Sequence, residues 1–271
     1  MDVIPITSTQ NPTVKAAVKL RDKRARDRSG LTLLEGYREL SRAHEYGMTL
    51  TEVFFCPEQF LGVNEYSLLE TLAASGCRMY RVPDFILTKM AYRERPEGLI
   101  AAARVRQHPL SALPLRENPL FLVAEAVEKP GNLGSMLRSA DAAGADGFIL
   151  CDPDTDIYNP NVIRASTGAV FSVPLAVCTS AEAIAFLRAH GIAIYSSTPH
   201  TDTLHSSVDM TAGTALVVGT EQVGLTDTWL EAAYVKIRIP MLGKIDSLNV
   251  ATAATLLLYE AARQRNWRIH G

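Results

Sequence analysis

Short apolar segments alternate with amphipathic segments along most of the chain. The apolar segments have the length and composition of strands, and the segments between them repeat apolar residues at helical spacing. This alternation is typical of α/β domains whose mostly parallel sheets are covered by helices on both faces. It is interrupted at 107–118, where prolines break both periods. The pattern therefore predicts a smaller N-terminal α/β domain at 1–106, a linker at 107–118 and a larger α/β domain at 119–271.

Each predicted domain contains several strand–helix pairs. In the first domain the predicted strands are 31–34, 50–56, 78–82 and 99–105, and the predicted helices are 35–46, 67–75 and 84–91. In the second domain the predicted strands are 120–126, 147–151, 172–176, 192–196, 215–219 and 235–239, and the predicted helices are 134–143, 161–167, 180–190, 226–233 and a terminal helix after Asn249. This layout specifies a fold class but no chemistry.

Polar residues gather at three strand-to-helix junctions of the second domain. Asn132 and Arg138 follow its first strand, Glu221 follows a later strand, and Ser247 and Asn249 precede the terminal helix. Taken singly, each residue also fits an ordinary role as a helix cap, a turn carboxylate or a surface charge. Because the carboxyl ends of parallel strands meet at one edge of a sheet, the side chains are expected to line a common pocket. The sequence therefore predicts a pocket with one cation, one anion and several hydrogen-bonding groups.

The segment 15–28 is the most basic stretch of the chain. It carries seven Lys and Arg residues against two Asp residues, with apolar residues interleaved at helical spacing. This pattern predicts a short amphipathic helix with a cationic side that ends at a turn around Gly30. A charged surface helix and an RNA-contacting helix are equally consistent with the segment alone.

The composition narrows the possible partners and compartment. The formal net charge is -2, so a polyanion would have to bind at a local patch. The four cysteines, Cys56, Cys77, Cys151 and Cys178, form no C-x-x-C pair and have no histidine at metal-ligand spacing. We therefore expect free thiols in a reducing compartment and no bound metal. No apolar run approaches the roughly 20 residues of a membrane helix, so a cytoplasmic protein without membrane contact is expected.

Three longer stretches of the second domain carry the junction residues. They are NLGSMLRSADAAGADG from Asn132, ALVVGTEQVGL from Ala215 and IPMLGKIDSLNVATAATLLLYE from Ile239. In order and spacing they resemble the three sequence motifs of the SpoU-type (TrmH-like) RNA ribose methyltransferases of the SPOUT class. The N-terminal domain resembles the substrate-binding domain of the rRNA-modifying members of this family. This second resemblance is carried by STQNP from Ser8, by the basic segment and by LLEGYREL from Leu33.

The resemblance implies a deep trefoil knot in the second domain and a homodimer whose active sites lie close to the subunit interface. It implies S-adenosylmethionine as the methyl donor and a ribose 2′-hydroxyl of RNA, most favourably 23S rRNA, as the acceptor. The implied catalytic residues are Arg138, Asn132, Glu221, Ser247 and Asn249. The implied cofactor contacts are Thr198, Gly219, Ile239, Met241 and Leu248. The expected RNA-binding residues are Lys15, Arg21, Lys23, Arg24 and Arg26, with Arg263, Arg265 and Arg268 as further candidates.

Several alternatives remain open from the sequence. Arg138 could accept the proton of the 2′-hydroxyl, or it could bind the neighbouring phosphate and stabilise the developing alkoxide. The substrate could be tRNA, and a non-catalytic RNA-binding protein could retain the same fold. A nucleotide-dependent oxidoreductase is disfavoured because the loop after the first strand lacks the G-x-G-x-x-G fingerprint. Lys129 stands where the family often has an acidic residue, and it could hold a substrate phosphate.

Overall fold

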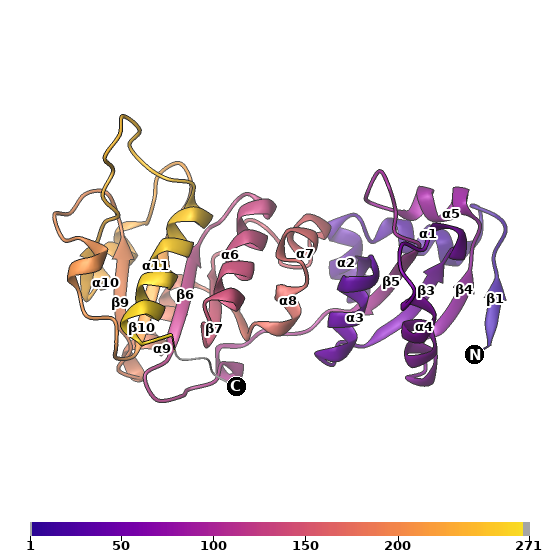
Figure 1. The fold of residues 1–271 in the computed structure, drawn as a ribbon, viewed down its shortest axis with the longest axis horizontal. Coiled ribbons are helices and arrows are strands. Elements are labelled where there is room, and N and C mark those ends of the chain that lie inside the picture. The colour runs from indigo at the N-terminus through magenta and orange to yellow at the C-terminus, as the bar shows by residue number, and fades with distance from the viewer. Residues whose placement is uncertain (1, 268–271) are drawn as a thin grey trace. The chain divides into compact units, whose positions relative to one another are not determined.

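The computed structural model describes residues 2–267, which form two compact units (Figure 1). The first unit contains the chain up to Gln107 together with Tyr158–Phe171, and the second contains His108–Ile157 and the chain from Ser172 onward. The division differs from the expected sequential one because a segment from the second half of the chain packs with the first unit. Among the described residues, no helix is both long and apolar enough to cross a membrane.

The first unit is built on a five-stranded mixed sheet with the order β1-β4-β3-β5-β2. Its strands are β1 (Val3–Pro5), β2 (Leu31–Glu35), β3 (Leu50–Phe55), β4 (Arg78–Arg81) and β5 (Leu99–Arg104). β5 is antiparallel to β2 and β3, and the other neighbouring strands are parallel. The accompanying helices are α1 (Pro12–Lys19), α2 (Lys23–Ser29), α3 (Tyr37–Glu45), the 3-10 helix η1 (Pro57–Gln59), α4 (Glu65–Ala74) and α5 (Asp84–Met90). The short edge strand β1 was not predicted.

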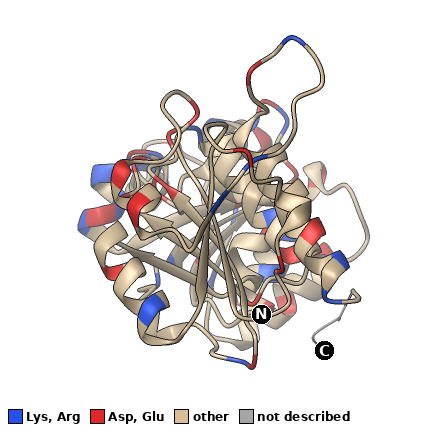
Figure 2. Cartoon of the chain, turned by 90° about the vertical axis from the view of Figure 1, so that its left-hand side faces the viewer, with Lys and Arg blue, Asp and Glu red and all other residues tan. Residues whose placement is uncertain are grey.

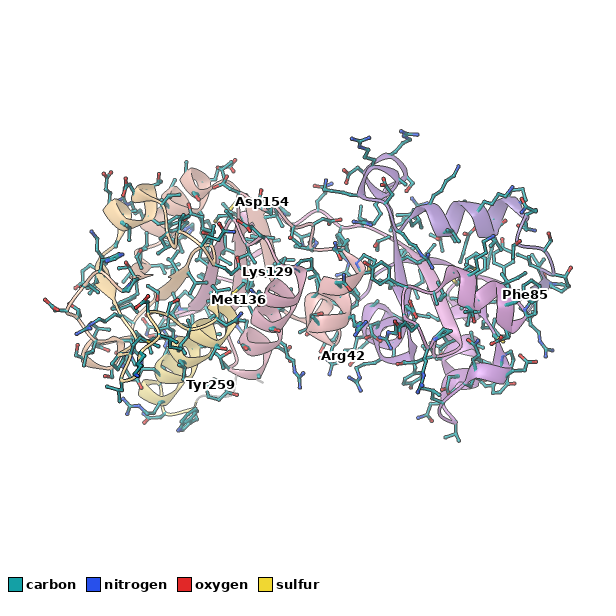
Figure 3. The ribbon with its side chains drawn as sticks, turned by 90° about the horizontal axis from the view of Figure 1, so that it is seen from above. Arg42, Phe85, Lys129, Met136, Asp154 and Tyr259 are labelled. Atoms are coloured by element: carbon teal, nitrogen blue, oxygen red, sulfur yellow. The ribbon has the colours of Figure 1, made fainter. Side chains whose placement is uncertain are left out.

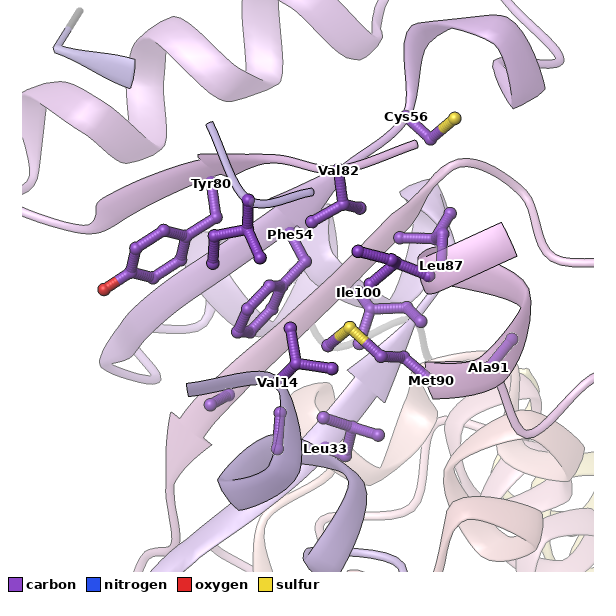
Figure 4. Packing of buried hydrophobic residues seen from close by; sticks show 14 of the residues in the cluster. Val14, Leu33, Phe54, Cys56, Tyr80, Val82, Leu87, Met90, Ala91 and Ile100 are labelled. Carbon is purple, nitrogen blue, oxygen red and sulfur yellow. The ribbon is translucent and has the colours of Figure 1, made fainter. Parts of the chain in front are cut away.

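Apolar side chains from the sheet, α1 and α5 form a core of the first unit (Figure 4). Phe54 and Tyr80 stack with their ring centroids 5.1 Å apart. Val14 approaches this pair from α1, and Met90 approaches Ile100 from α5. This core buries the apolar residues whose spacing predicted the strands and helices of the first unit.

The basic segment forms two short helices, not one. α1 ends at Lys19, and Asp22 begins α2 by accepting a hydrogen bond from the backbone N–H of Ala25 at 3.2 Å. α2 ends at Gly30, which has a left-handed φ of 65°. Asp is a common residue at a helix start and Gly at a helix end. Asp22 and Gly30 therefore indicated in the sequence where α2 begins and ends.

The segment Tyr158–Phe171 completes the first unit. It carries α7 (Pro160–Ser166) and most of α8 (Ala169–Ser172). The buried hydroxyl of Thr32 donates to the carbonyl of Tyr158 at 3.2 Å, and the backbone N–H of Arg106 donates to the Tyr158 hydroxyl at 3.0 Å. The guanidinium of Arg42 donates to the carbonyl of Thr167 at 3.2 Å. The chain thus returns to its N-terminal unit between β7 and β8 of the second unit.

The second unit is built on a six-stranded parallel sheet with the order β11-β9-β10-β6-β7-β8. Its strands are β6 (Leu120–Glu125), β7 (Gly147–Cys151), β8 (Leu175–Cys178), β9 (Ala193–Ser197), β10 (Thr214–Val218) and β11 (Val235–Ile237). Its helices are α6 (Pro130–Ala142), α9 (Ser180–Ala189), α10 (Asp227–Ala232) and α11 (Val250–Gln264), with the 3-10 helices η2 (Leu110–Ala112) and η3 (His205–Ser207). The predicted α/β architecture with a mostly parallel sheet is confirmed.

Helices cover both faces of this parallel sheet. Residues of α9 and α10 share one core with the sheet, in which Trp229 is completely buried. α6 and α11 pack against each other, and α11 contacts β6 and β10. In the view of Figure 2, Lys and Arg as well as Asp and Glu are present on this side of the molecule, in keeping with the small net charge. Burial on both faces explains why the strands are continuous apolar runs.

Two details of the second half differ from the sequence expectation. The predicted strand 172–176 is in fact the end of α8 followed by β8, because a short apolar run does not distinguish a strand from a buried helical turn. Part of the predicted linker packs onto the second unit: Leu113 is buried, and the carbonyl of His108 accepts a hydrogen bond from Val177 of β8 at 2.8 Å.

Candidate active site

A directed chain of hydrogen bonds joins the starts of α6 and α11 to the loop after β10 at one edge of the parallel sheet. Asn249 is the N-cap of α11, and its side-chain oxygen accepts from the backbone N–H groups of Ala251 at 3.0 Å and Thr252 at 3.4 Å. Its amide nitrogen donates to the side-chain oxygen of Asn132 at 3.0 Å. The amide nitrogen of Asn132 in turn donates to Oε1 of Glu221. The structure therefore brings together one residue from each of the three predicted junctions.

The direction of this chain follows from elementary chemistry. A backbone N–H can only donate, so the oxygen of Asn249 must face the start of α11 and its nitrogen must face Asn132. The oxygen of Asn132 is then occupied, and its nitrogen must face the carboxylate of Glu221. The free N–H groups at the helix start thus fix the orientation of both amides. We call Asn249, Asn132 and Glu221 the relay.

The relay ends at an unsatisfied acceptor. Oε2 of Glu221 is buried, and no hydrogen-bond partner for it is found among the described residues. Leaving a buried carboxylate oxygen unpaired costs about 1–3 kcal/mol or more. A ligand that presents an N–H or O–H donor to this oxygen would remove that cost.

The loop that carries Glu221 folds tightly back over Gly219. Thr220 and Gly224 exchange backbone hydrogen bonds of 3.0 and 3.2 Å. A Cβ at position 219 would lie 2.2 Å from both the carbonyl carbon and the carbonyl oxygen of Gly224. Gly224 has a left-handed φ of 75°, which closes the turn. Only glycine at position 219 allows the loop to place Glu221 next to Asn132.

Glu125, which the sequence analysis did not single out, fastens the far end of this loop. It is the last residue of β6, and its side chain is buried. Its carboxylate accepts from the backbone N–H of Thr226 at 2.9 Å and from the Thr226 hydroxyl at 2.7 Å, at the start of α10. The sequence signal for this role was a carboxylate at the end of an otherwise apolar strand. A buried charge in that position needs hydrogen-bond donors as partners.

Two hydroxyls connect α6 to α11 below the relay. Ser139 and Thr255 lie 2.7 Å apart through their hydroxyl oxygens. Thr255 also lies within hydrogen-bond distance of the carbonyl of Ala251, and Ser139 within that of Ser135. Each hydroxyl has one proton, so two of these three contacts can be hydrogen bonds at one time. One hydroxyl can donate to its carbonyl while the other donates across the two helices. This contact holds α6, and with it Arg138, in register with the helix that begins at Asn249.

Arg138 and Ser247 do not belong to the relay. Both side chains are exposed, and the Arg138 guanidinium makes no hydrogen bond or ion pair with the described residues. Lys129 is also exposed, directly before α6, while Met136 is buried along the same helix (Figure 3). The cations are thus available to a ligand, whereas Asn132 and Glu221 hold each other.

The segment 239–248 supplies an open backbone beside the relay. It has no helix or strand, and in the described structure none of its N–H groups donates to another backbone group. Ile239, Met241 and Leu248 are half-buried, whereas Leu242 is 96% exposed. Thr198, directly after β9, is buried, and its N–H donates to the carbonyl of Ile237 at the end of β11 at 2.9 Å. Unpaired backbone groups beside apolar side chains are the usual lining of a small-molecule pocket.

Two of the predicted RNA contacts are engaged inside the first unit. Arg26 is buried, with 3% of its surface exposed, and its guanidinium donates to the carbonyls of Leu20 at 3.0 Å and Arg21 at 2.9 Å. Its assignment as an RNA contact is therefore wrong, because these bonds make it a structural residue of the α1–α2 turn. Arg21 is half-buried and donates to the carbonyls of Lys89 and Ala91. Lys15, Lys23 and Arg24 are exposed.

The C-terminal arginines are also mostly engaged. Arg263 forms a two-pronged ion pair with Glu260, with bonds of 2.9 and 2.8 Å. Arg265 donates to the carbonyls of Met210 and Asn118, at 2.8 and 2.6 Å, and so holds α11 against neighbouring loops. Arg268 lies outside the described residues. In residues 2–267, no group of three or more His, Cys, Asp or Glu side chains could hold a metal ion.

Comparison with known proteins places these features in context. A model of the SpoU rRNA Methylase family matches residues 119–259, and a model of the MRM3-like substrate binding domain matches residues 11–101. The 23S rRNA (uridine(2479)-2′-O)-methyltransferase of Streptomyces viridochromogenes is 34% identical over 252 residues, which cover 91% of this chain and 87% of the relative. The 23S rRNA (guanosine(2553)-2′-O)-methyltransferase RlmP of Bacillus subtilis is 27% identical, with coverage of 94% and 97%.

Solved structures agree with this assignment over nearly the whole chain. A crystal structure of an RNA 2′-O ribose methyltransferase is 38% identical and superposes with a TM-score of 0.84, covering 97% of this chain and 100% of the other. The AdoMet-bound rRNA methyltransferase from Sinorhizobium meliloti is 29% identical, with a TM-score of 0.88 and coverage of 96% and 98%.

Proposed function

This chain belongs to the SpoU rRNA methylase family, and we propose that it methylates a ribose of 23S rRNA. It is an S-adenosylmethionine-dependent RNA (ribose-2′-O)-methyltransferase. The observation that supports the site assignment is the relay, because it joins Asn132, Glu221 and Asn249 from the three motif stretches. The match to a substrate-binding domain at residues 11–101 and the rRNA-modifying relatives support 23S rRNA over tRNA.

The residues of the relay and of the segment 239–248 fit S-adenosylmethionine. The methionine ammonium and the ribose hydroxyls of this molecule are donors, and the unpaired Oε2 of Glu221 is an acceptor. Its adenine is flat, with apolar faces and a polar edge, and the half-buried Ile239, Met241 and Leu248 flank open backbone groups that suit such a ring. We assign these three residues, with Thr198 and Gly219, to cofactor binding. Bound S-adenosylmethionine supplies a methyl group carried on a positively charged sulfur.

Arg138 is the residue that we assign to charge stabilisation. An exposed guanidinium keeps its charge and cannot readily accept a proton. It can bind the phosphate beside the target ribose and stabilise the oxygen as the 2′-hydroxyl proton departs. Of the two roles left open by the sequence, this environment favours the electrostatic one. Asn132 and Asn249 position Glu221, and exposed Ser247 stands at the entrance to α11.

We further propose a homodimer through the outer face of α11. Leu256 and Tyr259 on this helix and Trp267 after it are large apolar side chains that are 43%, 41% and 57% exposed. The Tyr259 and Trp267 rings meet edge to face, with centroids 6.2 Å apart. An apolar helix face beside the helix of Arg138 suits an interface close to the active site. Sedimentation equilibrium should give twice the mass of one chain, and a stable monomer at micromolar concentration would refute the dimer.

The same family membership leads us to propose the deep trefoil knot. The long loop between β9 and β10 bonds on one side to Arg238, just before the segment 239–248. On the other side it bonds to the end of α11, where the Gln264 amide accepts from Met210 at 2.7 Å and donates to Val208 at 3.0 Å. A loop fastened on both sides of a passing segment is what a threaded chain requires. Stretching single molecules from both termini tests this, because a knotted chain stops short of its full extended length.

RNA binding should depend on the exposed cations of α1 and α2. We expect Lys15→Ala combined with Arg24→Ala to weaken RNA binding and to lower the slope of log affinity against log salt by about 1.5, since each lost phosphate contact contributes about 0.7 to 0.9. S-adenosylmethionine affinity should not change. Arg188→Ala combined with Lys236→Ala, which removes the same charge from exposed positions of the second unit, is the control. Equal salt slopes in the two double variants would contradict this role for α1 and α2.

The proposed reaction is tested by transfer of a tritiated methyl group to unmodified 23S rRNA and, separately, to unmodified tRNA. Label in 23S rRNA at a ribose 2′-oxygen supports the proposal, and mapping it identifies the nucleotide. Label in tRNA alone would replace the substrate assignment. RNA binding without transfer would favour the non-catalytic alternative.

Because the proposed substrate, rRNA, is cytoplasmic in bacteria, we propose that the protein is located in the cytoplasm, which cell fractionation can check.

A further inference from the structure

Two cysteines end adjacent parallel strands of the second unit as direct register partners. Cys151 is the last residue of β7, Cys178 is the last residue of β8, and the two are paired across the ladder. Register partners point to the same face of a sheet, and neighbouring strands lie about 4.8 Å apart. That separation is within the range of Cα distances that disulfides span, about 4.4–6.8 Å. All four cysteines of the chain are free thiols in this structure.

The two thiols have unequal surroundings. Cys151 is fully buried in the core under α9 and α10, whereas Cys178 is half-buried at the edge of that core. Hydrogen bonding with Cys151 lowers the pKa of the Cys178 thiol below its ordinary value, although burial opposes this shift. Burial instead raises the pKa of Cys56 to about 11 and that of Cys77 to about 12. Cys178 is therefore the cysteine that combines access to solvent with a stabilised thiolate.

The backbones of both cysteines hold loops of the candidate active site. The carbonyl of Cys151 accepts from the N–H of Ala126, the residue directly after Glu125, at 2.9 Å. The carbonyl of Cys178 accepts from the N–H of Asp152 at 3.0 Å. Any change in the spacing of the two strand ends therefore moves the residue that follows β6 and the residue that follows β7.

Hydrogen bonds connect Asp152 to α10, the helix that follows the loop of Glu221. The Asp152 carboxylate accepts from the N–H of Ser180 at 2.9 Å and from its hydroxyl at 2.6 Å. The Ser180 oxygen accepts from the indole N–H of Trp229 at 2.8 Å. Trp229 lies in α10, the helix that begins at Thr226, where Glu125 holds the Gly219–Thr226 loop.

We propose that Cys151 and Cys178 form a peroxide-sensitive dithiol, which closes reversibly to a disulfide and thereby slows methyl transfer. The Cys178 thiolate attacks one oxygen of hydrogen peroxide, which yields a sulfenic acid and, after protonation of the leaving hydroxide, one water. The Cys151 thiol then attacks the sulfenic sulfur, and the second water leaves as the S–S bond forms. Overall, two thiols are oxidised and one peroxide is reduced to two waters. In-register parallel strands strain such a bond, so a thiol reductant should open it readily.

The chemical part of the proposal is tested on the full chain without any activity measurement. In the untreated protein, N-ethylmaleimide should label Cys178 before the other three cysteines. After treatment with hydrogen peroxide, mass spectrometry should find the peptides of Cys151 and Cys178 linked, with the loss of two hydrogen atoms, while Cys56 and Cys77 remain reduced. Cys178→Ser should abolish the linked species. Oxidation of Cys178 to sulfinic acid without linkage, or earlier reaction of Cys56 or Cys77, would overturn the dithiol.

The regulatory part rests on the proposed function. Peroxide should lower the methyl-transfer rate of the wild-type protein by about tenfold, because small displacements of positioning groups cost factors of 10 to 100. Dithiothreitol should restore the rate, and Cys178→Ser should keep its rate under peroxide. A linked pair with an unchanged rate would overturn the regulation. A linked pair in a protein that is inactive even before treatment would refute the proposed function and leave the dithiol standing.

Discussion

Arg138→Ala is expected to lower the rate of methyl transfer about 100- to 1,000-fold while S-adenosylmethionine binds with nearly unchanged affinity. The magnitude is that of removing one well-placed electrostatic contact to a developing negative charge. The separation of rate from cofactor affinity follows from the structure. Arg138 is exposed on α6 and is not part of the relay that holds Glu221, so its removal leaves the proposed cofactor pocket intact.

The measurement for Arg138 combines single-turnover transfer to RNA with calorimetry of S-adenosylmethionine binding. Arg188→Ala, which removes another exposed arginine from α9, is the matched control and should retain the wild-type rate. Arg138→Lys keeps the charge but loses the planar fork that binds phosphate in two places, so it should recover part of the lost rate. Normal turnover in Arg138→Ala would refute the assignment.

Gly219→Ala is expected to abolish both cofactor binding and activity, because the loop of Glu221 cannot close over a side chain. The added Cβ would meet the Gly224 carbonyl at 2.2 Å, and the atoms that it meets are backbone, which cannot rotate away. The loop must then open, which separates Glu221 from Asn132 and exposes the orphaned carboxylate oxygen. Overpacking of this severity should cost about 3 kcal/mol or more of unfolding free energy if the loop is forced to stay closed.

Urea unfolding and calorimetry with S-adenosylmethionine test the Gly219 prediction. The matched control is Gly213→Ala directly before β10, where an added Cβ would meet its nearest neighbour at an ordinary contact distance of 3.4 Å. This control should keep both its stability and its cofactor affinity. Cofactor binding by Gly219→Ala at wild-type affinity would mean that the closed loop is not part of the pocket.

The meeting of the three motif loops was predictable because it depends on a general property of parallel sheets. Once β6 and β10 are recognised as parallel strands, the residues that follow them must approach each other at one edge. Asn249 could be identified as a helix cap from its place before an apolar helix. The bonds within the relay could not be predicted, because they depend on distances of a few tenths of an ångström that a residue pattern does not contain.

The departures from the sequence expectation have a common physical origin in the hydrogen-bond partners of buried charges. Arg26 reads as one more cation in a basic run, yet the turn between α1 and α2 surrounds it with carbonyl acceptors. Glu125 reads as the end of an apolar strand, and its role depends on Thr226, a residue that follows another strand. Local patterns determine which face of an element is apolar, whereas the partner of a buried charge is determined by the fold.

The return of Tyr158–Phe171 to the first unit sets an order of assembly during synthesis. When the ribosome has made the chain only as far as Gln107, the buried hydroxyl of Thr32 and the backbone N–H of Arg106 still lack their partner Tyr158. The N-terminal unit is therefore not complete until β6, α6 and β7 have also emerged from the exit tunnel. The first unit, which we propose to select the RNA, therefore cannot reach its final state as an independent early product.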